Sequence, residues 1–367
     1  MGGSRMAGIL AALFAAFVWS LNFVIPFVIG DYTVFDFALL RFGISGLAGL
    51  GFLIIKIDAV RQLSPRDWLV TAWLAFIGYV GYFLTVTGAA IYAGPVIAAA
   101  LLGLVPIVLA VVGNIRQGSV PWRSLSIPLM LVALGLLFVN WNTFAALGAT
   151  NDDSLRVGMS LAVGAVALWT WFAVVNQSAL ANRPGMDSKI WTALTLFGGG
   201  LEMLAFFPVG TAAGLFELPR LGASWDTASN LYLWGGSLAI LTSIGGVWSW
   251  NVAARKLPIS LAAQLIVSET AFGAVFGLAA YGRWPTLAEA CGIVALIAGV
   301  VSAIHVFHRP PVAVDDVAGV RRTGRVTWEH ISWTESDQSP KPETSPPRRL
   351  AQAEFIDEDG RTLLRDV

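Results

Sequence analysis

The chain has 367 residues, of which 56% are hydrophobic and 13% are charged, and its formal net charge at pH 7 is zero. Soluble domains carry about 25% charged residues, and twenty of the 46 charged residues here follow residue 308. This composition excludes an ordinary soluble enzyme, a disordered regulator and a nucleic-acid-binding protein, which needs a basic surface. It indicates an integral membrane protein.

Cysteine and histidine are too few for most kinds of chemical site. The single cysteine, Cys291, cannot form an internal disulfide, and the three histidines lie at positions 305, 308 and 330, at or after the end of the last apolar segment. We therefore expect no metal site, no cofactor and no catalytic histidine within the membrane. The glycine-rich phosphate-binding motif of ATPases does not occur, which excludes ATP-driven pumping by this chain alone.

Long apolar segments follow one another along the chain. A membrane-spanning helix needs about 20 mainly apolar residues. Ten segments meet this condition, at 7–29, 34–55, 68–91, 94–113, 124–140, 157–181, 188–211, 231–253, 258–280 and 286–306. They lack the alternation of a membrane β-barrel. The first exceeds the roughly 7–15 residues of a signal peptide core. These segments predict an all-α membrane protein with ten transmembrane helices.

Basic residues in the connecting loops alternate between the two sides of the membrane. One side has eleven Lys and Arg residues, including Arg5 and Arg309, whereas the other has three, Arg156, Arg220 and Arg283. Cytoplasmic loops carry the excess of basic residues. We therefore expect a multi-pass protein of the cell (inner) membrane with both termini in the cytoplasm.

The composition changes after residue 308. Residues 309–367 contain six prolines and charges of both signs, with little apolar periodicity. This pattern predicts a largely disordered cytoplasmic tail. Within it, residues 350–364 are interpreted as a short helix or a docking segment, and the alternative is a solvated tail without a dedicated role.

The two halves of the chain resemble each other. A shift of 163 residues places Ala90 on Ala253 and Pro95 on Pro258, and similar matches continue through later helices. Because each half has an odd number of spans, the second must be inverted relative to the first. We therefore expect two inverted five-helix repeats, residues 7–140 and 157–306.

Five motifs recur in order along the helices, namely AAFVWSLNF (15–23), FALLRF (37–42), AIYAGPVIAAALLGLVPIV (90–108), VALWTWFAVVNQSAL (166–180) and WNVAARKLPISLAAQL (250–265). Together these motifs resemble those of the drug/metabolite transporter superfamily, specifically its EamA-type ten-helix carriers. Two of them, in the sixth and eighth helices, are also similar to the aromatic amino-acid exporter branch. The resemblance implies a central cavity lined by helices 1, 3, 4, 6, 8 and 9, and transport in the export direction. The chain departs from the family pattern at Glu269, where proline is usual, and at Gly282-Arg283, where Gly-Glu is usual.

Ionisable side chains inside the predicted helices cost about 2.5–3.5 kcal/mol each to insert, so each needs a reason. The deepest are Arg41, Glu202 and Glu269. Arg41 either pairs with Asp36 or a helix-end carbonyl, or contacts an anionic group of a substrate. Glu269 is a candidate for proton coupling, since protonation removes the charge, or else it forms a buried interhelical hydrogen bond. Glu202 is a third candidate, on a helix expected nearer the periphery.

Polar and aromatic side chains share helix faces. Gln264 and Ser268 lie four residues apart and should face a cavity or another helix, because lipid would leave them without hydrogen bonds. Other candidates pair aromatic rings or amides three to seven residues apart, namely Trp19 with Asn22, Tyr79 with Tyr82, Trp169 with Asn176, and Trp248 with Asn251. Aromatic rings with a few amides suit a pocket for an amphipathic solute. The alternative for each is helix packing alone.

These observations predict a secondary transporter, in the export direction, for small organic metabolites such as amino acids. It would work by alternating access around a wettable, aromatic-walled hollow near the bilayer midplane, with proton exchange or facilitated diffusion. The alternatives are an exporter of hydrophobic cations and a non-transporting scaffold acting through its tail; an enzyme is disfavoured. The expected partners are a small-molecule substrate and the lipid bilayer, not nucleic acid, and the oligomeric state stays open.

Overall fold

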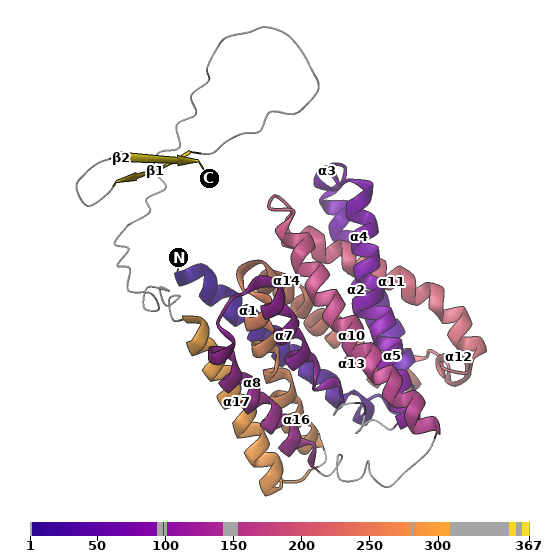
Figure 1. Cartoon of the computed structure of the whole chain (residues 1–367). Coiled ribbons are helices and arrows are strands. Elements are labelled where there is room, and N and C mark those ends of the chain that lie inside the picture. Colours follow the sequence, from indigo (N-terminus) through magenta and orange to yellow (C-terminus); the bar gives the residue numbers. More distant parts are fainter. Residues whose placement is uncertain are drawn as a thin grey trace. The chain divides into compact units, whose positions relative to one another are not determined.

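The structure, a computed structural model, describes residues 2–93, 98, 101–141, 153–280, 282–308, 352–356 and 362–366. The chain divides into two compact units, Met1–Val312 and Ala313–Val367. The described part of the first unit is a bundle of helices (Figure 1).

The first half of the bundle follows the predicted segments. The helix α2 (Val34–Ile55) has the predicted bounds. The remaining elements of this half are α1 (Gly2–Ser20), the 3₁₀ helix η1 (Leu21–Phe27), α3 (Ile57–Val60), α4 (Pro65–Ala75), the π-helical turn η2 (Phe76–Val80), α5 (Gly81–Ala93), α7 (Val105–Gln117) and α8 (Trp122–Val139). Part of the predicted segment 94–113, residues 94–97, 99 and 100, lies outside the described residues.

The second half also contains a span with a π-helical turn. Its elements are α10 (Asp153–Ala181), α11 (Ser188–Ala212), α12 (Leu218–Leu221), α13 (Trp225–Leu238), the π-helical turn η4 (Ala239–Gly246), α14 (Val247–Lys256), α15 (Ile259–Ile266), α16 (Ser268–Ala280) and α17 (Leu287–His308). The predicted span 258–280 is thus two helices, interrupted at Val267.

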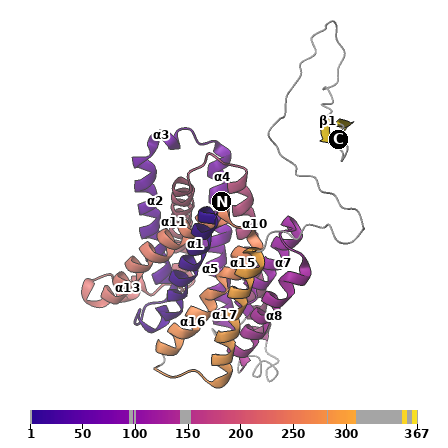
Figure 2. The same cartoon turned by 90° about the vertical axis from the view of Figure 1, so that its left-hand side faces the viewer.

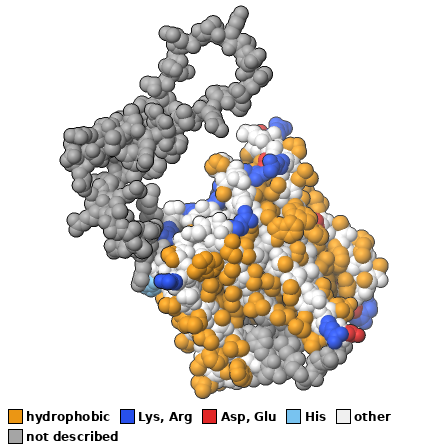
Figure 3. All heavy atoms as spheres, in the orientation of Figure 1, with side chains coloured by type: hydrophobic (Ala, Val, Ile, Leu, Met, Phe, Trp, Pro, Cys, Tyr) orange, Lys and Arg blue, Asp and Glu red, His pale blue; other side chains and the backbone are white. Residues whose placement is uncertain are grey.

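Among the described residues, eight continuous helical stretches are long and apolar enough to cross a membrane, and two apolar helices, Ser4–Ser20 and Val105–Gln117, are shorter. Each overlaps one of the ten predicted segments. Large apolar side chains also face outward, as with Ile55, which is 77% exposed. Hydrophobic side chains cover most of the face in Figure 3, as expected for a surface that contacts lipid. The prediction of an all-α membrane protein is confirmed.

The start of α2 is fixed by its own sequence. The Thr33 hydroxyl accepts a hydrogen bond from the backbone N–H of Asp36, and the Asp36 carboxylate accepts one from the backbone N–H of Thr33. This reciprocal capping satisfies two N–H groups that a helix N-terminus otherwise leaves unpaired. The Asp36 carboxylate also accepts the backbone N–H groups of Glu217 and Leu218, which ties α2 to the loop after α11.

Glycines set two close helix contacts on opposite sides of the bundle, α2 against α11 and α8 against α17 (Figures 1 and 2). A Cβ built on Gly46 would lie 2.9 Å from the Cα of Gly200, and one built on Gly200 would lie 2.9 Å from the Cα of Gly46. In the second pair, a Cβ on Gly299 would lie 2.8 Å from Cγ2 of Val132. Larger side chains would separate these helices, so glycine is required for the observed approach.

The two halves share an irregularity as well as a helix order. The π-helical turn η2 begins at Phe76, and η4 begins at Ala239, 163 residues later. That separation equals the shift that aligns the two halves of the sequence. The helix contacts correspond too, since α5 packs on α10 while α14 packs on α1. A π-helical turn inserts one residue into a helix and is frequent at functional sites.

The second unit contains two described strands, β1 (Gln352–Ile356) and β2 (Thr362–Asp366), which pair antiparallel with Gln352 opposite Asp366. The interpretation of residues 350–364 as a short helix is therefore wrong for the described residues. Polar and apolar residues alternate in β1, and Asp359-Gly360 between the strands is a typical hairpin sequence. The predicted disorder of residues 309–351 lies outside the described residues.

Candidate functional site

Four aromatic side chains from different helices meet inside the bundle, and we call them the aromatic cluster: Trp19, Tyr82, Trp169 and Trp250. The Trp169 ring centroid lies 5.4 Å from that of Trp19, 5.1 Å from that of Tyr82 and 6.3 Å from that of Trp250. The Trp19 indole N–H also donates to the backbone oxygen of Thr242, at 2.9 Å. The rings therefore contact one another at the centre, where the sequence predicts an aromatic-walled hollow.

One predicted member of this group lies elsewhere. Trp248 is 42% exposed, so its side chain is on the outside of the bundle, whereas Trp250 is 1% exposed and contacts Trp19. The prediction paired Trp248 with Asn251, three residues later on the same helix face. However, α14 packs against α1 on one side and against α10 and α11 on another. These contacts bury both Trp250 and Asn251. Trp248 lies on the part of α14 that these helices leave exposed.

Arg41 joins the two halves of the bundle. Its Nε donates to the Ser243 hydroxyl, at 2.9 Å, and a terminal N–H donates to the Asn22 amide oxygen, also at 2.9 Å. The predicted pairing with Asp36 is wrong, because Asp36 accepts from the backbone instead. Two partners do not use all five N–H groups of a guanidinium. Arg41 thus keeps donors for another group.

Glu269 is half-buried and lies within electrostatic range of Arg41 and of Tyr82 in the aromatic cluster. It is the second residue of α16, directly after the interruption at Val267. The neighbouring Ser268 hydroxyl donates to the backbone oxygen of Leu265, at 2.7 Å, within the same span. A cation, a carboxyl group and aromatic rings are therefore grouped inside a membrane helix bundle.

Gln264, in α15, is completely buried, and neither its amide oxygen nor its nitrogen has a hydrogen-bond partner among the described residues. The Ser260 hydroxyl, one turn earlier, the Tyr79 hydroxyl and the Trp250 indole N–H likewise lack partners in the described part. A buried polar group without a hydrogen bond costs about 1–3 kcal/mol. The bundle interior therefore has unused hydrogen-bonding capacity that a polar solute or water would satisfy.

Asn176 and Asn251 make hydrogen bonds to other helices. The Trp191 indole N–H donates to the Asn176 amide oxygen, at 2.8 Å, and the Asn176 amide nitrogen donates to the Asn251 oxygen, at 2.8 Å. The Asn251 nitrogen donates in turn to the Thr192 hydroxyl, at 2.9 Å. We call these four residues the amide network. It connects α10, α11 and α14, so in this structure both asparagines hold helices together.

The remaining candidate, Glu202, lies away from the aromatic cluster. It is half-buried on α11, where its neighbours Leu201 and Leu204 are 51% and 55% exposed. One of its carboxyl oxygens has no hydrogen-bond partner among the residues that the structure describes. Glu202 therefore lies near the outward-facing side of α11.

Polar contacts close the bundle beyond both ends of this site. Arg183, in the loop between α10 and α11, forms an ion pair with Asp67 at the start of α4, with Nε and Oδ1 2.5 Å apart. Its guanidinium also lies over the Trp191 ring, 5.4 Å from the centroid. At the other end, the Tyr32 hydroxyl donates to the backbone oxygen of Gly222, at 2.7 Å. Each contact joins the first half of the chain to the second.

Three comparisons with known proteins agree with this architecture. Residues 6–141 match the EamA-like transporter family. Inner membrane protein YtfF of Escherichia coli (strain K12) is 29% identical over 319 residues, which cover 83% of this chain and 97% of that protein. A solved crystal structure with 16% identity covers 82% of this chain and 99% of its own, with a TM-score of 0.64, and so shares the fold. The chain is therefore similar over most of its length to an inner membrane protein, and its residues 6–141 are similar to the EamA-like transporter family.

Proposed function

We propose that the chain is a secondary transporter that exports small organic metabolites, such as amino acids, across the inner membrane by alternating access. The observation that carries this proposal is the placement of Arg41 and Glu269 beside the aromatic cluster. An amino acid has a carboxylate, an ammonium group and a side chain. Arg41, Glu269 and the aromatic rings are complementary to these three parts.

The residues would share the recognition of such a substrate. The free N–H groups of Arg41 suit the substrate carboxylate, and the Glu269 carboxylate suits the ammonium group. The rings of Trp19, Trp169 and Trp250 suit an apolar or aromatic side chain. Gln264 adds an amide with both atoms available. The ring contacts fill the centre in this structure, so binding requires these side chains to separate.

Alternating access is supported by the correspondence between the two halves. Their π-helical turns are related by the shift that aligns the sequences, and the closing contacts at both ends join one half to the other. Opening one end while the other stays closed would expose the central residues to one side at a time. The proposed repeats are residues 7–140 and 157–306, with both termini in the cytoplasm.

Proton exchange is the proposed energy source, and Glu269 is the proposed coupling group. A carboxyl group in a membrane site can give up its proton to one side and regain it from the other as the site alternates. Arg41 would favour the ionised carboxylate when no substrate anion is bound. A bound substrate carboxylate would compete with Glu269 for Arg41, which links substrate binding to proton uptake.

Transport should be measured in proteoliposomes with labelled amino acids and cationic dyes, with and without a pH gradient. We expect saturable flux of an apolar or aromatic amino acid that a pH gradient accelerates. Glu269→Gln should abolish the pH dependence, whereas the matched control Glu202→Gln, a half-buried carboxyl outside the site, should retain it. Flux of dyes alone would favour the hydrophobic-cation exporter.

Removal of residues 309–367 separates the carrier from the scaffold alternative. A carrier composed of the helical unit keeps its flux without these residues. Loss of function in the cell with unchanged flux in vesicles would favour a scaffold acting through its tail.

A further inference from the structure

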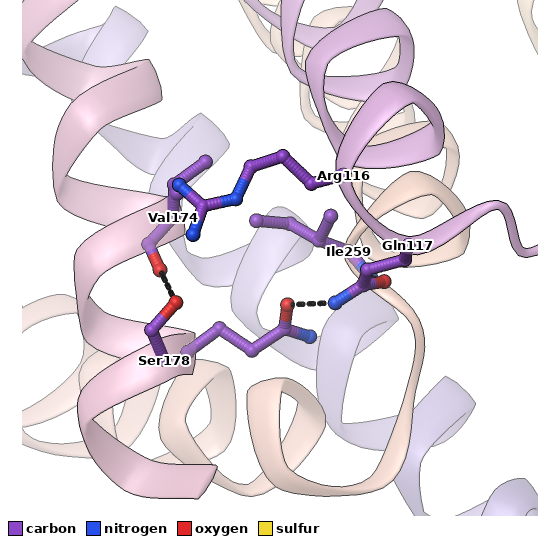
Figure 4. A pocket seen from close by; sticks show the side chains of 6 residues that line it. Arg116, Gln117, Val174, Ser178 and Ile259 are labelled. Carbon is purple, nitrogen blue, oxygen red and sulfur yellow. Dashed lines mark hydrogen bonds between the residues drawn. The ribbon is translucent and has the colours of Figure 1, made fainter. Parts of the chain in front are cut away.

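A pocket of about 200 Å³ lies between the ends of α7, α10 and α15 (Figure 4). None of its lining residues belongs to the aromatic cluster, and the sequence analysis does not predict this pocket. The residues that line it are Arg116, Gln117, Val174, Gln177, Ser178 and Ile259. About seven waters would fill this volume at roughly 30 Å³ each, so it accommodates a group of several heavy atoms.

Two glutamines fix the polar wall of the pocket. The Gln117 amide nitrogen donates to the Gln177 oxygen, at 2.7 Å, and the Gln117 oxygen accepts the backbone N–H of Ile259, at 3.0 Å. The Gln177 nitrogen donates to the backbone oxygen of Leu257, at 2.8 Å. The Gln117 nitrogen keeps a second N–H for a ligand. The wall is therefore held in place by both halves of the chain.

The pocket is electropositive. Arg116 is exposed, and its side chain extends toward Val174 and Ser178 (Figure 4). None of the lining residues is acidic, and no ion pair joins Arg116 to a carboxylate within the described part of the chain. Ile259 is the first residue of α15, so the positive end of that helix dipole faces the same region. A guanidinium and a helix N-terminus together favour an oxyanion.

The surroundings favour a lipid as the source of this oxyanion. Arg116 lies in the last turn of α7, on the side that carries the excess of basic residues and is expected to face the leaflet where anionic lipids concentrate. The preceding residue, Ile115, is 68% exposed and offers an apolar surface to an acyl chain. We propose that this pocket binds the phosphate group of an anionic phospholipid.

The occupied pocket would hold together the ends of three helices that belong to both halves of the chain. The bound phosphate would contact Arg116 on α7 and would lie beside α10 and the start of α15. Binding should therefore stabilise the folded protein, because a ligand that binds only the folded state shifts unfolding by mass action. This inference does not depend on the identity of the transported substrate.

The test uses the purified full chain in detergent with short-chain phosphatidylglycerol, short-chain phosphatidylcholine and inorganic phosphate as probes. Bound lipid is counted by native mass spectrometry, and the thermal unfolding midpoint is followed in parallel. Phosphatidylglycerol should bind and raise the midpoint more than phosphatidylcholine does. Arg116→Gln should weaken phosphatidylglycerol binding about tenfold, the effect expected for losing a charged hydrogen bond.

The matched control is Arg123→Gln, because Arg123 is exposed at the same end of the bundle and does not line the pocket. It should leave phosphatidylglycerol binding unchanged. Equal loss in both variants would mean that general surface charge attracts the lipid, and it would overturn the proposal. Displacement of phosphatidylglycerol by inorganic phosphate, with the same dependence on Arg116, would assign the pocket to free phosphate and overturn the lipid source.

Discussion

The ion pair between Asp67 and Arg183 should control how easily its end of the bundle opens. Their side chains are 13% and 19% exposed, so solvent screens the pair less than it screens a surface pair. Asp67 also accepts the backbone N–H of Ser64, which caps α4. In Asp67→Asn the remaining amide oxygen keeps that cap, while the charge opposite Arg183 is lost.

The expected cost is about 2 kcal/mol, within the range for a hydrogen bond between charged groups. Since 1.4 kcal/mol corresponds to a factor of ten, the equilibrium for opening this end should rise about 30-fold. Hydrogen–deuterium exchange of the loop between α10 and α11, which contains Arg183, would measure this change. Faster exchange confined to this loop and the start of α4 is the expected pattern.

The control for this experiment is Asp58→Asn. Asp58 pairs with Arg61 at 3.9 Å, and both side chains are largely exposed, at 93% and 75%. Such pairs contribute little to stability, so exchange should not change. If Asp67→Asn and Asp58→Asn leave the exchange of the loop equally slow, the ion pair does not hold this end closed.

Three further substitutions test the packing described above. Gly299→Ala should lower thermal stability by about 1–3 kcal/mol, because its Cβ would meet Val132, whereas Gly164→Ala, where nothing lies within 4 Å, should not. Trp250→Phe should reduce transport more than Trp248→Phe does, and equal effects in a flux assay would contradict the inward position of Trp250. Asn251→Ala should cost about 1–2 kcal/mol in thermal unfolding, since it removes two buried hydrogen bonds of the amide network, one to Asn176 and one to Thr192.

The positions of the helices could be predicted because they depend on local sequence. The bounds of α2 follow from Thr33 and Asp36 at its start and from the apolar run that ends before Lys56. Length and hydropathy are properties of contiguous residues, so they can be read without knowing which helices are neighbours. The same argument explains why each apolar helix of the structure overlaps a predicted segment.

The inner contacts could not be predicted in the same way, because they join distant residues. Arg41 binds Ser243, 202 residues away, rather than its sequence neighbour Asp36. The helical spacing between Trp248 and Asn251 describes a shared face but not the helices that surround α14. The helices α1, α10 and α11 pack on different sides of α14 and bury Trp250 as well, and only the tertiary arrangement reveals this.

The contact between Gly46 and Gly200 has a mechanical consequence. The backbones of α2 and α11 approach closely at Gly46 and again at Gly49, and a tilt of α2 about this crossing would move its two ends in opposite directions. Gly46 lies near the middle of α2, twelve residues from Val34 and nine from Ile55. At 1.5 Å per residue, a tilt of about ten degrees moves the two ends by roughly 2–3 Å in opposite directions. A small rotation at this crossing would therefore widen one mouth of the bundle while it narrows the other.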